Sequence, residues 1–343
     1  MPKRHFAPSD HHLHLMEKTE REFAWWDGGD FEEWQAGLRR RFKELLGGFP
    51  AEQGPLHVEE TEQVECEGFT RTGLVFRAED HADVSAYLLV PKRHGLPRPA
   101  MVCLQGHAPG MHISIGVAND EHERKLVAGD RDFAVQAVRE GFVALAMEQR
   151  CFGERAETKQ QMRWDHPCLD AVFHALILGQ TLIGERVRDV CRAVDLLEQR
   201  PEVDADHIAC MGNSGGGKVS FYAACVEPRI ELAVASCTFA QYAGSSMRFR
   251  HCGDTYIPGI LKVAEMGEIG GLIAPRKLII VSGENDGIFP VDSARAGFRQ
   301  AREIFAAAGC AENIRHVVGP EGHRFYADLA WPVVHELIPQ ATM

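Results

Sequence analysis

The sequence has no run of about 18 or more apolar residues, the length at which a helix can span a bilayer, so no transmembrane segment is predicted. It also has no excess of basic residues, since 37 Lys and Arg face 49 Asp and Glu for a formal net charge of −12. This acidity disfavours binding to nucleic acid or to an anionic membrane surface. Residues 1–8 carry charge but no apolar segment, so we expect no signal peptide. The sequence leaves open whether the chain forms a homo-oligomer.

Cysteine occurs ten times, but no pair has the C-x-x-C spacing that is typical of zinc and redox motifs. Several cysteines, such as Cys103, lie in apolar runs, where a free thiol behaves as a small hydrophobic side chain. This pattern disfavours a disulfide scaffold and predicts a reduced, cytoplasmic protein. His11, His12 and His14 suggest a metal site, but they lie in the polar segment 1–22, which we expect to be a mobile or surface tail.

The distribution of apolar residues predicts an α/β protein with an added N-terminal segment. Residues 1–54 are expected to form a helical extension, with an amphipathic helix that starts at a capping box at Asp30. Residues 55–343 are expected to form the main, catalytic domain. There, β-like segments in 55–92 precede buried strands that alternate with helices, which predicts a doubly wound, mostly parallel sheet with antiparallel strands at its N-terminal edge. The irregular stretch 239–272 is expected to be a small cap-like insertion.

Two features in the middle of the chain lead to further predictions. The helical stretch 170–199 is expected to break near Gly184, because glycine is a poor helix former.

Glu148 and Arg150 follow a predicted buried strand and therefore lie at its carboxyl end. They are candidates for substrate binding, but a structural ion pair with a neighbouring loop is the simpler interpretation.

A glycine-rich segment gives the first chemical signal. Ser214 lies between Gly212 and Gly216 at a predicted strand-to-helix turn, which matches the nucleophile elbow G-x-S-x-G. The turn is sharp, and its neighbours must be nearly free of side chains for the hydroxyl to be exposed. The same segment approaches the phosphate-binding pattern G-x-x-x-x-G-K-[ST], but Val219 follows Lys218 where a hydroxyl is needed for Mg²⁺. A P-loop nucleotide-binding protein is therefore a remote alternative.

An acid and a histidine follow the serine at the ends of two later strands. Asp286 lies in the loop after the predicted strand 277–281, with Glu284 and Asp292 as rival acids. His323 lies on a glycine-flanked loop after the last predicted strand, whereas His316 and His335 fall inside regular elements, the former in a strand and the latter in a helix. The order Ser, Asp, His is that of an α/β-hydrolase triad, with Ser214 as nucleophile, His323 as base and Asp286 as its partner.

The oxyanion hole of such a site needs two backbone N–H groups. Gly215 supplies one because it follows the nucleophile, and the loop after the strand 100–104 supplies the other. We predict His107 for the second donor, with Gly106 as the alternative. The substrate pocket is expected to draw side chains from the insertion 239–272, and the candidates are Met247, His251 and Tyr256.

These segments together resemble an α/β-hydrolase of the dienelactone-hydrolase and acetyl-xylan-esterase-like kind. The resemblance extends from about residue 85 to the end of the chain. It implies Ser214, His323 and Asp286 as the catalytic residues, and neither a metal nor an organic cofactor. The segments that carry it are Leu104-Gln105-Gly106-His107, Glu148-Gln149-Arg150-Cys151-Phe152-Gly153-Glu154-Arg155, Met211-Gly212-Asn213-Ser214-Gly215-Gly216-Gly217, Gly283-Glu284-Asn285-Asp286 and Glu321-Gly322-His323-Arg324-Phe325.

The reaction expected from this sequence is hydrolysis of a small carboxylic ester, such as an acetyl or sugar ester, through an acyl-enzyme. Esters are the first choice because their leaving groups need the least assistance. Cleavage of an amide or peptide bond is the second interpretation, and hydrolysis of a carbon–carbon bond is the third, because all three reactions can use the same triad.

Overall fold

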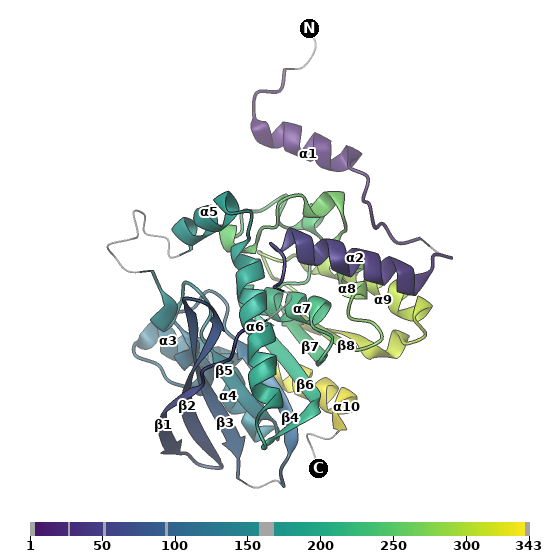
Figure 1. Cartoon of the computed structure of the whole chain (residues 1–343). Helices are drawn as coiled ribbons and strands as arrows, with labels where there is room; N and C mark the ends of the chain where they lie inside the picture. The colour runs from purple at the N-terminus through teal and green to yellow at the C-terminus, as the bar shows by residue number, and fades with distance from the viewer. Residues whose placement is uncertain (1–3, 27, 51–52, 93–94, 158–167, 340–343) are drawn as a thin grey trace.

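One nine-stranded sheet runs through the part of the chain that the structure describes, residues 4–26, 28–50, 53–92, 95–157 and 168–339 of a computed structural model (Figure 1). The strand order is β1-β2-β3-β5-β4-β6-β7-β8-β9. Strands β1, β2, β3 and β5 pair antiparallel, and all pairings from β5 to β9 are parallel. The predicted sheet is therefore confirmed. The strands are β1 Glu59–Glu65, β2 Phe69–Glu79, β3 Ala82–Pro91, β4 Arg98–Leu104, β5 Val143–Met147, β6 Val203–Asn213, β7 Ile230–Ser236, β8 Lys277–Gly283 and β9 Ile314–Gly319.

Helices cover both faces of the sheet (Figure 1). One face carries the long helices of the middle of the chain together with α2, and the other carries α4 and α10. The helices are α1 Pro8–Lys18, α2 Phe31–Leu45, α3 Glu121–Leu126, α4 Phe133–Arg139, α5 Leu169–Ile177, α6 Leu182–Glu198, α7 Gly215–Val226, α8 Met266–Gly271, α9 Val291–Ala307 and α10 Ala327–Leu337. None of the helices in the described ranges is long and apolar enough to cross a membrane.

Alternating side chains of the central strands build two apolar cores. In β4, Val102 and Leu104 point into the core under α2, α6 and α7, whereas Met101 and Cys103 point into the core under α4 and α10. Successive residues of a strand face opposite sides, so a strand covered on both faces is apolar throughout. Every residue of β4 is buried for this reason.

Helix α2 of the N-terminal extension packs on the main domain. The Asp30 side chain caps it by accepting a hydrogen bond from the Glu33 N–H at 3.0 Å, which is one of the two hydrogen bonds of the predicted capping box. Trp34, Leu38 and Phe42 form its buried stripe. The preceding segment contains α1, which lies at the edge of the molecule with no buried residue and so agrees with the expected surface segment (Figure 1).

The predicted helix break is present, but it lies at residues 178–181, shortly before Gly184. Helix α5 ends at Ile177 and α6 begins at Leu182, after the N-cap residue Thr181, whose hydroxyl accepts a hydrogen bond from the Gly184 N–H at 3.1 Å. Gly184 lies inside the first turn of α6. A Cβ at this position would lie 1.8 Å from the Leu46 carbonyl oxygen, so glycine allows a close approach of two segments instead of ending a helix.

Candidate active site

Ser214 lies on a strained turn between β6 and α7. Its backbone has φ 57° and ψ −121°, a conformation that a non-glycine residue rarely adopts. The flanking glycines make this turn possible. A Cβ on Gly212 would lie 2.5 Å from the carbonyl carbon of Gly216, and one on Gly216 would lie 2.3 Å from the Gln105 carbonyl oxygen. The geometry is that of a nucleophile elbow, in which the serine is held at the carboxyl edge of the sheet.

His323 and Asp286 are joined by a hydrogen bond. The His323 Nδ1 lies 2.8 Å from Asp286 Oδ2, and Asp286 Oδ1 accepts hydrogen bonds from the N–H groups of Ile288 and Phe289 at 2.8 and 3.0 Å. The carboxylate is therefore fixed by its own loop. When Nδ1 donates to Asp286, the other ring nitrogen, Nε2, is left to act as a base. Burial acts to raise the pKa of Asp286, but the hydrogen bond and charge of His323 and the two N–H donors lower it overall.

Ser214 and His323 line one cavity of about 370 Å³. Among the described residues, no hydrogen bond joins the Ser214 hydroxyl to the imidazole; such bonds tighten when substrate binds. The ring of Phe289 stacks on that of His323 with centroids 5.8 Å apart, which restricts the orientation of the imidazole. The lining residues of this cavity, called the serine cavity below, are His107, Arg131, Ser214, Gly215, Lys218, Arg250, His251, Cys252, Thr255, Ile288, Phe289 and His323.

The two residues predicted for the oxyanion hole also line the serine cavity. Gly215 is the first residue of α7, and His107 follows β4. The two residues lie next to each other, because a Cβ on Gly215 would lie 3.2 Å from His107 Nδ1. Burial opposes protonation of the His107 ring, but its hydrogen bonds with Asp254 and Cys168 raise the pKa to about 9.

The three predicted pocket residues lie in two places. His251 lines the serine cavity, where its ring meets that of Phe289 edge-on at 4.7 Å. Met247 and Tyr256 line a separate groove of about 410 Å³, which they share with residues of α1. The insertion 239–272 thus contributes to both cavities.

Lys218 is a further residue of the serine cavity, although its sequence motif pointed only to a P-loop. It lies on α7, its backbone N–H donates a hydrogen bond to the Ser214 carbonyl oxygen at 2.9 Å, and both residues line the serine cavity. The side chain is buried, and its Nζ lies 5.3 Å from the Phe289 ring centroid and 5.7 Å from that of Tyr242. Burial lowers the pKa of Lys218 to about 8. Its position in the first turn of the helix that follows the serine was the signal available in the sequence.

Arg150 has a structural role. Its guanidinium donates hydrogen bonds to Asp189 at 2.8 and 3.0 Å, to Glu185 at 2.9 Å and to Glu79 at 2.5 Å. These partners lie on β2 and α6, so the interaction joins the carboxyl end of β5 to both elements. The simpler of the two interpretations of Arg150, an ion pair, is the one the structure supports.

Glu148 is buried beside a loop and forms no ion pair with any residue that the structure describes. Its two carboxyl oxygens lie 3.1 and 3.0 Å from the Met111 backbone nitrogen, which donates to them. The carboxyl group also packs against Gly153, where a Cβ would lie 1.8 Å from Glu148 Oε2. Burial raises the pKa of Glu148 to about 7, although the hydrogen bond from Met111 acts in the opposite direction.

The raised pKa of Glu148 predicts a loss of stability as pH rises. Below the pKa of the unfolded state, near 4.5, both states are protonated, whereas between about 4.5 and 7 unfolding releases a proton. Over this window the free energy of unfolding should fall by up to about 3 kcal/mol because of this group. Glu148→Gln should flatten this fall, measured by urea unfolding from pH 4.5 to 8, while the exposed control Glu303→Gln, which is not among the groups that shift the pKa of Glu148, keeps it. Equal slopes for wild type and Glu148→Gln would contradict the prediction.

Two sets of side chains have the composition of a metal site. One is Cys237 with the pair Asp286 and His323, whose hydrogen bond already accounts for the contact. The other contains His107, Cys168, Cys252 and Asp254, of which His107 and Cys252 line the serine cavity. The expectation from the sequence that the protein holds no metal stays a prediction, and the second set is the reason to test it.

The parallel sheet, the strained serine and the Asp–His pair define an α/β-hydrolase. The profile of the Abhydrolase family matches residues 14–303, so the chain belongs to this family. A protein of Bacillus subtilis (strain 168) named "Putative hydrolase YtaP" is 25% identical over 298 residues, which cover 84% of this chain and 94% of that protein. Family membership disfavours the P-loop interpretation of the glycine-rich segment.

Solved structures agree with this assignment of the fold. A protein from Bacteroides fragilis NCTC 9343, described as a "putative acetyl xylan esterase", superposes with a TM-score of 0.82 at 18% identity, over 98% of this chain and 95% of its own. A glucuronoyl esterase from Solibacter usitatus gives a TM-score of 0.68 at 16% identity, over 95% and 98% of the two chains. The predicted α/β-hydrolase fold is confirmed, and the more specific likeness to dienelactone hydrolases stays a prediction.

Proposed function

We propose that the protein hydrolyses a carboxylic ester, with Ser214, His323 and Asp286 as its catalytic triad. The observation that carries this proposal is the hydrogen-bonded pair His323–Asp286 in the same cavity as a serine with φ 57°. A strained serine by itself also occurs in tight turns, and a histidine–carboxylate pair by itself also occurs as a structural ion pair. Their combination at the carboxyl edge of a parallel sheet is the arrangement that nucleophilic catalysis needs.

The proposed reaction starts when His323 Nε2 accepts the proton of the Ser214 hydroxyl and Oγ attacks the ester carbonyl. Asp286 holds the ring in the required tautomer and stabilises the imidazolium. The backbone N–H groups of Gly215 and His107 are proposed to stabilise the oxyanion. The imidazolium then returns its proton to the leaving alcohol. Water attacks the acyl-enzyme in the second half of the reaction, with His323 again as the base.

A panel of substrates tests the choice of bond. Short-acyl 4-nitrophenyl esters and acetylated sugars should be hydrolysed above the buffer rate, and anilides with the same acyl groups should react much more slowly. Faster cleavage of the anilides would favour the amidase alternative. Absence of turnover on every ester in the panel, by protein that is folded by circular dichroism, would contradict the proposal.

The lining of the serine cavity suggests the charge of the substrate. It includes three basic side chains, Arg131, Lys218 and Arg250, and no acidic side chain among the lining residues that the structure describes. At neutral pH the Lys218 amine, with a pKa of about 8, is largely protonated. A substrate with a carboxylate or several hydroxyl groups near the scissile ester would complement this lining.

Removal of the Lys218 charge should therefore change the substrate specificity more than the rate of the chemical step. Lys218→Met keeps the apolar stem and should raise KM for an ester that carries a free carboxylate, such as a hemisuccinate, by about tenfold, the loss expected for one charge-assisted hydrogen bond. KM for the matching neutral acetate should change by less than about threefold, and Lys125→Met on the exposed side of α3 is the control. Equal changes for both substrates would contradict a role of Lys218 in charge recognition.

A further inference from the structure

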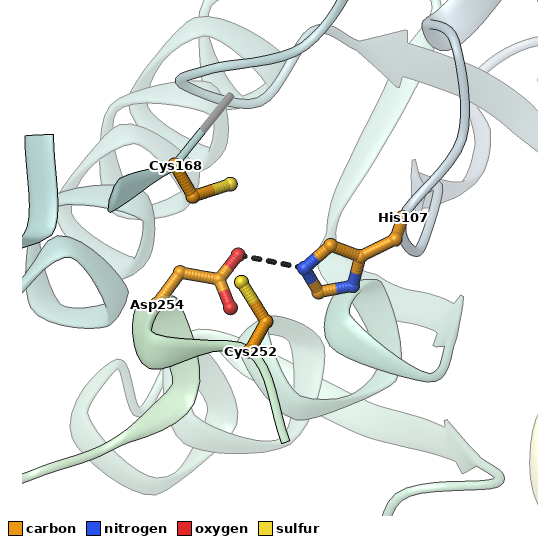
Figure 2. Close-up of side chains that lie close together, drawn as sticks. All are labelled: His107, Cys168, Cys252 and Asp254. Carbon is orange, nitrogen blue, oxygen red and sulfur yellow. Dashed lines mark ion pairs between the residues drawn. The ribbon is translucent and has the colours of Figure 1, made fainter. Parts of the chain in front are cut away.

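Four potential metal ligands meet beside the serine cavity. His107 follows β4, Cys168 immediately precedes α5, and Cys252 and Asp254 lie at a short helical turn, Gly253–Thr255, in the cap-like insertion. One ligand atom from each lies within 4.8 Å of the others. The imidazole, the carboxylate and the two sulfur atoms point toward a common space (Figure 2).

These distances suit a tetrahedral zinc ion. Zinc binds thiolate sulfur at about 2.3 Å and imidazole nitrogen or carboxylate oxygen at about 2.0–2.2 Å, which places ligand atoms roughly 3.3–3.8 Å apart. Because the four ligand atoms already lie within 4.8 Å of one another, only small side-chain adjustments are needed to reach that geometry. Two sulfur donors also select zinc over magnesium or calcium, which prefer oxygen.

One carboxylate oxygen of this cluster is buried and incompletely satisfied. Asp254 is 1% exposed, and its Oδ2 accepts hydrogen bonds from His107 Nε2 at 3.0 Å and from Arg186 Nη1 at 2.6 Å. Its Oδ1 has no hydrogen-bond partner within the described residues. A buried carboxylate oxygen without a partner is costly, and a bound cation would remove that cost.

Arg186 balances the charge that the cluster would have with zinc. It is fully buried, and its Nη2 lies 3.6 Å from Cys168 Sγ. With zinc bound, two thiolates and one carboxylate would be neutralised by the metal ion and the guanidinium, so no net charge would be buried.

We propose that His107, Cys168, Cys252 and Asp254 form a binding site for one zinc ion. All four positions are filled by protein, so the metal is structural and takes no part in the chemistry. It joins three segments that are far apart in the sequence: the loop after β4, the start of α5 and the cap-like insertion. Since the His107 backbone N–H is a proposed oxyanion donor, zinc would also hold that loop in place; this second role depends on the proposed function, whereas the metal site does not.

Metal content and a cobalt spectrum test the site directly. The full-length protein is purified in reducing buffer without chelator, and zinc is measured by inductively coupled plasma mass spectrometry. We expect about one zinc per chain in wild type and in the control Cys66→Ser, and less than about one tenth in Cys168→Ser and Cys252→Ser. Replacement of zinc by Co²⁺ in wild type should give a thiolate-to-cobalt charge-transfer band and tetrahedral ligand-field bands.

Three results would overturn the proposal. The first is absence of zinc, and of the cobalt bands, after incubation of reduced wild type with equimolar metal at about pH 8, where the ligands can lose their protons. The second is full zinc content in both cysteine variants. The third is a disulfide between Cys168 and Cys252 in freshly purified protein, seen by non-reducing peptide mapping. The cobalt measurement uses wild type, so it decides the question even when a variant does not fold.

The link to catalysis is tested separately. Removal of zinc by a chelator should lower kcat for ester hydrolysis by about tenfold, with KM changed by less than about twofold, because the oxyanion donor acts in the transition state. Readdition of zinc should restore the rate. An active enzyme whose kcat is unchanged by zinc removal would refute the role at the oxyanion loop. An inactive protein with one zinc per chain would refute the proposed function and leave the metal site standing.

Discussion

Ser214→Ala is expected to lower kcat for ester hydrolysis by about 10⁴–10⁶-fold, with little change in KM or in the free energy of unfolding. The variant retains the cavity but has no nucleophile, so no acyl-enzyme can form. The residual rate would come from binding and from the oxyanion donors alone. Initial rates on a 4-nitrophenyl ester, with active sites counted by burst titration of wild type, provide the measurement.

Ser220→Ala is the matched control for this variant. Ser220 lies on the same helix, and its hydroxyl donates a hydrogen bond to the Gly216 carbonyl at 2.9 Å, away from any proposed chemistry. Its kcat should stay within about threefold of wild type. Near-wild-type turnover by Ser214→Ala, or an equal loss in Ser220→Ala, would contradict the assignment of the nucleophile.

Asp286→Asn should lower kcat by about 10³–10⁴-fold and leave the fold intact. In wild type the carboxylate accepts the Nδ1 proton of His323 at 2.8 Å. An asparagine amide can donate a hydrogen bond to Nδ1 instead, which favours the tautomer with the proton on Nε2. The ring then cannot accept the Ser214 proton, and the imidazolium loses its negative partner.

The rival acids identified in the sequence provide the control. Glu284 pairs with Arg295 at 2.7 Å on the surface, and the Asp292 side chain is 92% exposed. Glu284→Gln and Asp292→Asn should therefore retain kcat within about threefold of wild type. A loss in either variant as large as that of Asp286→Asn would mean that the acid has been assigned to the wrong residue.

The fold could be predicted because its signals are local in the chain. Buried strands of the centre, such as 100–104, are continuous apolar runs, and the alternation of strands with helices leaves few topologies. The glycines around Ser214 are also a local signal, because only residues without a Cβ permit that turn. The helix break was predicted a few residues too late because Gly184 allows a close contact with Leu46 and does not end a helix. A contact between distant segments does not appear in the periodic pattern of apolar residues.

The site was harder to predict wherever it depends on contacts across the chain. Ser214, Asp286 and His323 follow the order typical of the fold, so their positions at strand ends were enough to propose them as the triad. The cluster of His107, Cys168, Cys252 and Asp254 has no such order, and its cysteines lack the short spacing that marks most zinc motifs. Packing of the cap-like insertion against the loop after β4 brings these side chains together, and no sequence pattern encodes that packing.

The central claim is that Ser214 is an activated nucleophile, and labelling with a fluorophosphonate tests it most directly. Folded wild-type protein is treated with the probe at neutral pH, and the adduct is located by peptide mapping and tandem mass spectrometry. We predict stoichiometric labelling at Ser214, none in Ser214→Ala, and strongly slowed labelling in Asp286→Asn. Absence of labelling in active protein, or an adduct at another residue that persists in Ser214→Ala, would contradict the claim.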